Sequence, residues 1–159
     1  MSTRWLSADQ QRSWRAYIAA TTLLSDRLSR ELQSAHKLTL SDYEILVRLS
    51  EAPDRRLRMS ELADYTLSSR SRLSHQIDRL EDQGIVERQA CETDRRGANA
   101  VLTDKGFDLL VEAAPTHVDG VRKHLVDLLT DEQFAALGSA LAVVAEHLQS
   151  PDCDEQRSA

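Results

Sequence analysis

The chain has 159 residues, of which 41% are hydrophobic and only 4% aromatic, and its formal net charge is −6 at pH 7. This length suffices for one domain with its own core, and a content of five glycines and three prolines favours a mainly α (α+β) fold with one small hairpin. The acidic balance argues against a protein that coats DNA or anionic membranes without specificity, although it allows a local basic face.

No apolar run approaches the roughly 20 residues of a membrane span, and the N-terminus lacks the apolar core of a signal peptide. We therefore expect a cytoplasmic protein. The two cysteines, Cys91 and Cys153, form neither a disulfide framework nor a zinc pattern. We expect no metal and no cofactor.

A long helix is predicted over residues 7–35, because Trp14, Ile18, Leu24, Leu28 and Leu32 share one face. Such an apolar face needs a partner. An aromatic residue on this stripe, such as Trp14, is more typical of a core or an interface than of a platform on which a ligand stacks.

A second helix is predicted to begin at Ser41, where Ser41 and Glu44 have the spacing of a capping box, and to end before Pro53. Residues 57–59 are expected to form a short strand. The nearby Arg55, Arg56 and Arg58 fit either phosphate contacts or a solvated turn.

Residues 60–66 and 69–83 are expected to form a helix-turn-helix. In the second helix Leu73, Ile77 and Leu80 form one apolar stripe. Ser68 or Ser69 is the predicted N-cap, and Gly84 stands where a left-handed residue would end the helix. The exposed N-terminal half then presents cationic and hydrogen-bonding groups.

Two strands, 85–89 and 98–102, flank a predicted hairpin tip that carries Arg95 and Arg96. Residues 70–106 contain seven Arg or Lys and seven acids, so their net charge is zero and the charge of −6 lies elsewhere. Arginines gather at the helix start and the hairpin tip, the reverse of what the helix dipole favours. The pattern predicts a helix that reads the major groove of DNA beside a hairpin that contacts the minor groove.

Thr103 is the predicted cap of the next helix, which Pro115 should bend or break so that a second part runs over residues 116–129. Thr130 and Gln133 form another capping box before a last helix with an apolar stripe. The polar residues 150–159 are expected to be disordered.

The flanking helices carry more apolar surface than the small DNA-binding head, the helix-turn-helix and hairpin, can cover. We therefore expect a homodimer that presents two such heads to two half-sites of a near-palindrome. The predicted organisation is an N-terminal dimerisation helix (1–37), a DNA-binding domain (38–106), C-terminal dimerisation helices (107–149) and the tail (150–159).

Several stretches together resemble the multiple antibiotic resistance regulator (MarR) family of bacterial winged helix-turn-helix proteins. They are LTL at 38–40, SELA at 60–63, RLEDQGIVER at 79–88, DRRG at 94–97 and LTDKG at 102–106. The resemblance implies an obligate dimer with a recognition helix at 69–83 and a wing in which Asp94 holds Arg96 while Arg95 or Arg96 enters the minor groove. The residues implied to contact bases and phosphates are Ser69, Arg70, Ser71, Arg72, Ser74 and His75.

Many members of that family are repressors released by phenolic or lipophilic ligands. In this chain the resemblance implies a crevice lined by Trp14, His36, Tyr43 and His117. The first helix lacks the cysteine of peroxide-sensing members, and His117 and His124 are spaced too widely for a usual helical metal pair.

The leading hypothesis is therefore a sequence-specific transcriptional regulator that binds double-stranded DNA. The alternative is a ligand-independent architectural or partner-binding winged helix. An enzyme is not expected, since the sequence lacks a phosphate loop, a nucleophile elbow and a paired metal motif.

Overall fold

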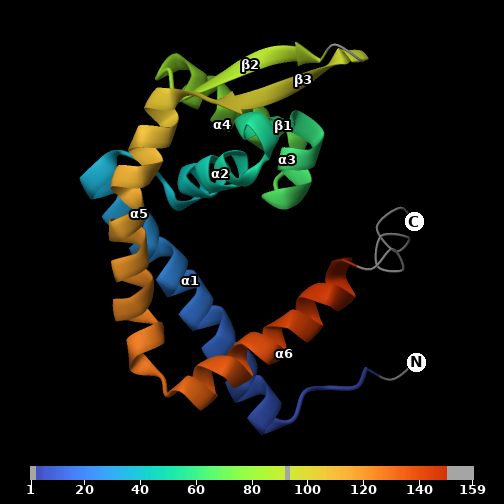
Figure 1. Cartoon of the computed structure of the whole chain (residues 1–159). Helices are drawn as coiled ribbons and strands as arrows, with labels where there is room; N and C mark the ends of the chain where they lie inside the picture. The colour runs from blue at the N-terminus through green and yellow to red at the C-terminus, as the bar shows by residue number, and fades with distance from the viewer. Residues whose placement is uncertain (1–2, 92–93, 150–159) are drawn as a thin grey trace. The chain divides into compact units, whose positions relative to one another are not determined.

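The computed structural model describes residues 3–91 and 94–149, and of Cys91 and residues 94–96 it describes the backbone alone. The chain forms two compact units, Met1–Gly120 and Val121–Ala159. The elements are α1 (Ala8–His36), α2 (Leu40–Glu51), the 3-10 turn η1 (Pro53–Arg55), β1 (Arg56–Arg58), α3 (Met59–Tyr65), α4 (Arg70–Asp82), β2 (Val86–Cys91), β3 (Asp94–Leu102), α5 (Asp104–His124), η2 (Val126–Leu128) and α6 (Asp131–Gln149) (Figure 1). The mainly helical fold with one small sheet is confirmed. The predicted disordered tail, 150–159, lies outside the described residues.

The core of the first unit lies where α2, α3 and α4 meet the sheet. The predicted stripe of α4 is buried, since Leu73 and Ile77 are fully covered and Leu80 is 1% exposed. Each such side chain contributes about 1.5–3 kcal/mol through burial. Other fully or almost fully buried members are Leu32, Leu38, Ile45, Leu46, Leu49, Leu62, Val86, Ala100 and Ala113. This core fixes α4 beneath the hairpin.

The sheet has three antiparallel strands in the order β1-β3-β2. Ala100 of β3 stands opposite Leu57 of β1 and Arg88 of β2, which sets the register of the whole sheet. Both strands of the hairpin run further toward the tip than the sequence predicted, and a register shift follows Ala90. The hairpin extends beyond the helices beneath it (Figure 1). This is the wing of a winged helix.

The predicted N-cap of α2, Ser41, is wrong by two residues. Thr39 is the N-cap: its Oγ1 accepts a hydrogen bond from Asp42 N at 3.1 Å, and Asp42 Oδ2 accepts one from Thr39 N at 3.0 Å. The sequence holds two overlapping capping boxes, Thr39 with Asp42 and Ser41 with Glu44. The first one forms because Asp42, 3% exposed, also pairs with Arg79 of α4, whereas Glu44 faces solvent.

Pro115 was predicted to bend or break the fifth helix, and the break does not occur, because α5 runs through the proline and ends at His124. Ala113 and Gly120, on either side of Pro115, are both buried, and an added Cβ at Gly120 would lie 2.8 Å from the Leu28 side chain of α1. Packing on both sides of the exposed proline therefore offsets the hydrogen bond that it removes.

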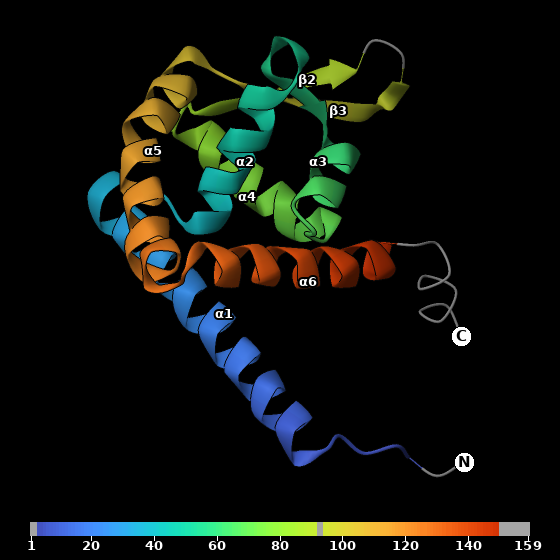
Figure 2. The same ribbon diagram turned by 60° about the horizontal axis from the view of Figure 1, so that its bottom comes forward.

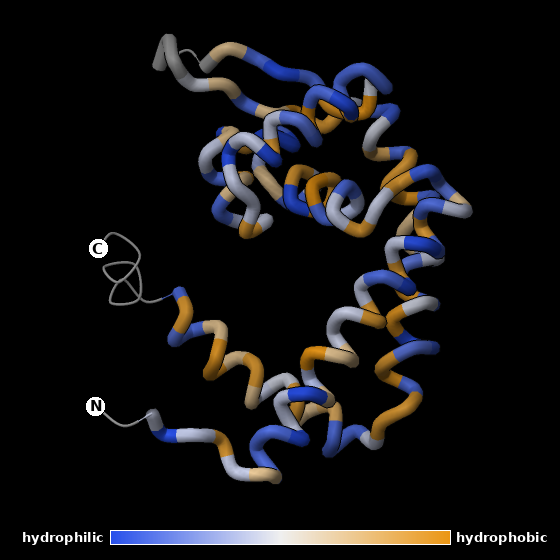
Figure 3. Tube along the Cα trace, turned by 180° about the vertical axis from the view of Figure 1, so that it is seen from behind, coloured by the Kyte–Doolittle hydropathy of each residue, from blue (hydrophilic) through white to orange (hydrophobic). Residues whose placement is uncertain are grey.

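The N-terminal part of α1 projects from the head, as Figures 1 and 2 both show. Apolar residues recur along α1 and also along α6 (Figure 3). Large side chains that remain exposed in the single chain are Trp14, Tyr17, Ile18 and Leu23 on α1, and Phe134, Leu141, Val143, Val144 and Leu148 on α6. Among residues 3–91 and 94–149, no single helix is long and apolar enough to cross a bilayer, and only α5 and α6 taken together meet that test, by length and composition.

Candidate nucleic-acid interface

The helix α4 begins and ends where its sequence predicts. Ser69 is the N-cap, and its Oγ accepts a hydrogen bond from Arg72 N at 3.2 Å. Beyond the C-terminus Gly84 has φ +70°, a conformation that residues with a Cβ rarely adopt. The turn from α3 contains Leu67 at φ 50°. These local signals set the two ends of α4.

The exposed face of α4 carries four of the predicted contact residues, namely Arg70, Ser71, Arg72 and His75, all exposed. Its first turn holds no acidic residue. Because the helix N-terminus is itself electropositive, two arginines there strengthen a positive potential rather than neutralise it. This face suits an anionic polymer with hydrogen-bonding edges, such as a DNA groove.

Ser69 and Ser74 lie at the same end of the helix but are already engaged. The Ser69 hydroxyl caps the helix, and Ser74 is half-buried. Arg88 of β2 donates from Nη2 to Ser74 Oγ at 2.9 Å and to Ser74 O at 3.0 Å. Arg88 also pairs with Asp78, and its backbone N donates to Glu81 Oε1 at 2.9 Å. The hairpin is thus bonded to α4 along about two turns.

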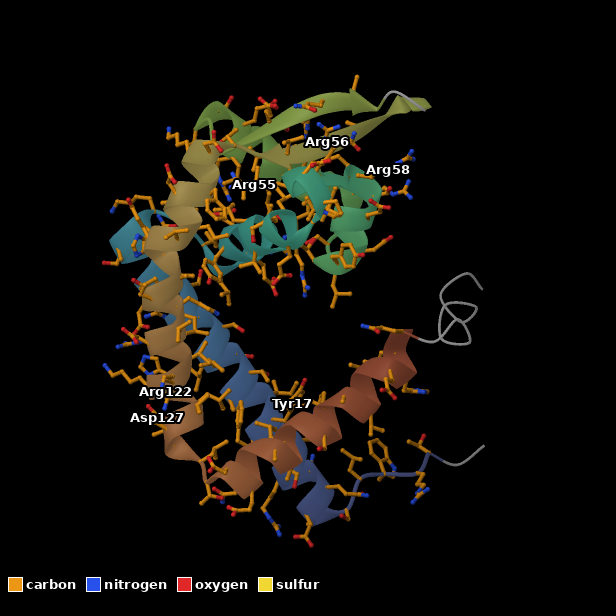
Figure 4. The ribbon with its side chains drawn as sticks, viewed as in Figure 1. Tyr17, Arg55, Arg56, Arg58, Arg122 and Asp127 are labelled. Carbon is orange, nitrogen blue, oxygen red and sulfur yellow. The ribbon has the colours of Figure 1, made fainter. Side chains whose placement is uncertain are left out.

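A hollow of about 490 Å³ opens between β1, α3, α4 and the hairpin. Arg58, Arg70 and Arg88 bring three guanidinium groups to its lining, beside Ser60. Figure 4 shows Arg58 at the end of β1, next to α3. The sequence left Arg58 open between a phosphate contact and a solvated turn. Its position beside the start of α4 becomes visible only once the sheet has formed.

Arg55, by contrast, is held at the start of α5. Its Nη1 donates to Asp104 Oδ1 at 3.0 Å, and its guanidinium lies 3.9 Å from the centre of the Phe107 ring. Arg55 therefore lies among the residues that join η1 to α5, whereas Arg58 lines the hollow. Arg55 and Arg58, although close in sequence, therefore do not belong to one cluster.

The predicted wing residues Asp94, Arg95 and Arg96 occupy the first positions of β3. Their side chains lie outside the described residues, and so does the predicted salt bridge between Asp94 and Arg96. The backbone places them toward the tip of the hairpin (Figure 1).

Three of the four predicted ligand-contact residues meet between the end of α1, the start of α2 and the middle of α5. The Tyr43 and His117 rings lie 4.5 Å apart, and His36 Nε2 is 2.9 Å from Thr116 Oγ1. Burial raises the pKa of Tyr43. Burial lowers the pKa of His117, and the nearby Glu44 carboxylate partly opposes that shift.

Trp14 does not join these three residues. It is 54% exposed and stacks on Tyr17, with 6.0 Å between ring centres. It precedes His36 by 22 residues, or ~33 Å along a straight helix.

The His117 Nδ1 atom is buried and has no hydrogen-bond partner among the described residues, which leaves a polar atom for a bound molecule or water to satisfy.

Comparisons with known proteins agree with this architecture. Residues 36–97 match the model of the MarR family. The HTH-type transcriptional regulator PecS of Dickeya dadantii is 31% identical over 133 residues, which cover 82% of this chain and 79% of PecS.

Two crystal structures of MarR family transcriptional regulators from Streptomyces coelicolor are also similar. Sco3205, solved in complex with DNA, is 50% identical, covers 94% of each chain and gives a TM-score of 0.90. AbsC is 48% identical, covers 92% of this chain and 99% of its own, and gives a TM-score of 0.87. The chain therefore belongs to the MarR family of winged-helix, DNA-binding transcriptional regulators, which are not enzymes.

Proposed function

We propose that this protein binds a palindromic operator in double-stranded DNA as a homodimer, with sequence specificity, and represses transcription until a small ligand releases it. The observation that carries the proposal is the exposed basic face at the N-terminal end of α4, next to a wing. The solved DNA complex of Sco3205, a relative that is 50% identical over 94% of this chain, supports it.

In this proposal α4 enters the major groove. The contacts to base edges and phosphates come from the exposed residues Arg70, Ser71, Arg72 and His75. The N-cap residue Ser69 contacts the phosphate backbone of the DNA. At the wing, Asp94 holds Arg96 extended, and Arg95 or Arg96 enters the adjacent minor groove. A minor-groove arginine adds affinity where the groove is narrow.

The proposed dimer interface uses the apolar surfaces that a single chain leaves exposed. On α1 these include Trp14, Ile18 and Leu23, and α6 bears a second set that ends with Leu148. Exposed apolar surface on this scale marks an interaction site. A second copy of the chain covers it in our proposal, and the dimer then presents two α4 helices to two half-sites.

The proposed effector is a small aromatic or lipophilic molecule that binds beside His36, Tyr43 and His117. An aromatic ring against a histidine, with a hydroxyl close by, is a surface on which a phenolic compound can stack and form hydrogen bonds. We assign Trp14 to the dimer interface of α1, because it lies far along that helix from the other three residues.

Selection of bound fragments from genomic DNA tests the proposal. A regulator of this kind enriches a near-palindromic site whose half-sites lie about one helical turn apart. Enrichment without any shared sequence would instead favour an architectural winged helix that grips DNA mainly through its phosphates.

A further inference from the structure

Arg88 joins the wing to the recognition helix through both its backbone and its side chain. The backbone N donates to Glu81 Oε1 at 2.9 Å. The guanidinium donates from Nη2 to the carbonyl and hydroxyl oxygens of Ser74, at 3.0 and 2.9 Å, and from Nη1 to the carboxylate of Asp78. One residue of β2 thus bonds to three residues of α4.

These three partners follow one another at i, i+4 and i+7, so they lie along one side of α4. The guanidinium that donates to Ser74 and Asp78 is a rigid, planar group. If α4 rolled about its axis or slid along it, Ser74 and Asp78 would leave the guanidinium together. The Arg88 side chain is only 30% exposed, which limits the competition from water for these bonds.

The position of these bonds along the helix matters as well. At the C-terminal end of α4, Ile85 N donates to Leu80 O at 3.0 Å and ties the helix to the start of β2. Ser74 lies six residues before Leu80, or ~9 Å nearer the DNA-reading end. Through its two bonds to Ser74, Arg88 therefore also holds the half of α4 that carries Arg70 and His75.

We propose that Arg88 is a positioning residue for sequence discrimination, because it fixes α4 against the wing so that both elements meet their grooves at once. The inference rests on the proposed reading of DNA by α4 and the wing. It also assigns Ser74 to this link, where its hydroxyl accepts from Arg88, rather than to a base contact.

The sharpest test is Arg88→Lys, which keeps the positive charge but replaces the fork with a single ammonium group. A lysine still serves a phosphate contact, whereas it cannot hold Ser74 and Asp78 together. The matched control is Arg30→Lys on α1. Arg30 also donates two hydrogen bonds through its guanidinium, from Nε and Nη2 to the two oxygens of the Asp26 carboxylate, but at an exposed site.

Binding is measured to the selected operator and to random duplex of equal length, over a series of salt concentrations. We expect Arg88→Lys to weaken operator binding about tenfold, as a mismatched base pair would. Random-duplex affinity and the salt slope should stay unchanged, and Arg30→Lys should behave as the wild type. Undiminished operator affinity would overturn the proposal, because a lysine can replace an arginine that only contacts phosphate. Equal loss on both duplexes would overturn it as well, since the effect would then not concern sequence discrimination.

The second variant is Ser74→Ala, which tests the same link if Arg88→Lys does not fold. A smaller loss of operator affinity, spread over the whole half-site, is expected. A changed preference at one base pair alone would make Ser74 a base reader and overturn the proposal. If the wild type itself does not discriminate between operator and random duplex, the proposed function fails first, and the two failures are thereby distinguished.

Discussion

Replacement of Asp42 by alanine should destabilise the fold far more than loss of an ordinary surface carboxylate. Its side chain is 4% exposed and meets three needs at once. It accepts a hydrogen bond from Thr39 N at 3.0 Å in the capping box, lies in the first turn of α2, and pairs with Arg79 of the recognition helix.

The expected loss in the free energy of unfolding follows from these contacts. Thr39 remains the N-cap after this change, so at the capping box one hydrogen bond is lost, the one from Thr39 N, which contributes about 0.5–1.5 kcal/mol. A hydrogen bond to a charged group contributes about 1.5–3 kcal/mol, and the lower part of that range applies because Arg79 is 50% exposed and regains water. We therefore expect Asp42→Ala to lower the free energy of unfolding by about 2–3 kcal/mol.

Urea denaturation at a fixed protomer concentration measures this loss, since the stability of a dimer depends on concentration. The matched control is Asp9→Ala. Asp9 also lies in a first helical turn and pairs with an arginine, Arg12, but its side chain is 84% exposed. That change should cost less than ~1 kcal/mol. Equal losses for Asp9→Ala and Asp42→Ala, or a larger loss for Glu44→Ala than for Asp42→Ala, would refute the reasoning.

Four further predictions concern packing, pH and DNA contact. Gly106→Ala should cost at least ~2 kcal/mol in urea denaturation, because the added Cβ would lie 2.2 Å from the backbone oxygen of Ile85; wild-type stability would disprove this close packing. The lowered pKa of His117 means that the unfolded chain takes up the proton first, so stability should fall as the pH drops below 6.5 toward the folded-state pKa. His117→Gln should show a shallower fall, and parallel curves would exclude this role. Arg96→Ala should weaken operator binding by more than ~1 kcal/mol without dissociating the dimer, and unchanged affinity would contradict the wing contact. His75→Ala should alter sequence preference more than the salt slope, whereas the opposite result would make it a phosphate contact.

The recognition helix was predictable because its signals are local. Leu73, Ile77 and Leu80 define its buried face by spacing alone, and Ser69 and Gly84 mark its two ends. The same holds for the last helix, where Thr130 N donates to Gln133 Oε1 and Gln133 N donates to Thr130 Oγ1 as the capping box requires. Contacts within four residues need no knowledge of the fold.

The two wrong predictions, the N-cap of α2 and the break at Pro115, concern places where tertiary contacts determine how the helix begins or continues. Thr39 and Ser41 both satisfy a capping pattern, and the choice depends on Arg79, which lies 37 residues after Asp42. At Pro115 the local rule predicts an interruption, but the close approach of Gly120 to α1 keeps the helix continuous. Neither contact can be read from neighbouring residues.

The same limit applies to the candidate site. The exposed residues Arg70, Ser71, Arg72 and His75 follow from helical periodicity. The role of Arg88 does not, because its bond to Ser74 joins residues 14 apart through the packing of a strand on a helix. The sequence carries no clear signal for it, because Arg88 lies between Glu87 and Gln89 in a polar strand, where a charged side chain is ordinary.

The central claim is that the exposed face of α4 and the wing read a DNA sequence. The most direct measurement is competition between the selected operator and a scrambled duplex of the same length and composition, at a fixed salt concentration near physiological. The account predicts operator binding at least ~10³-fold tighter than binding to the scrambled duplex, as for specific regulators. Comparable affinities for the two duplexes, both falling steeply with salt, would contradict it.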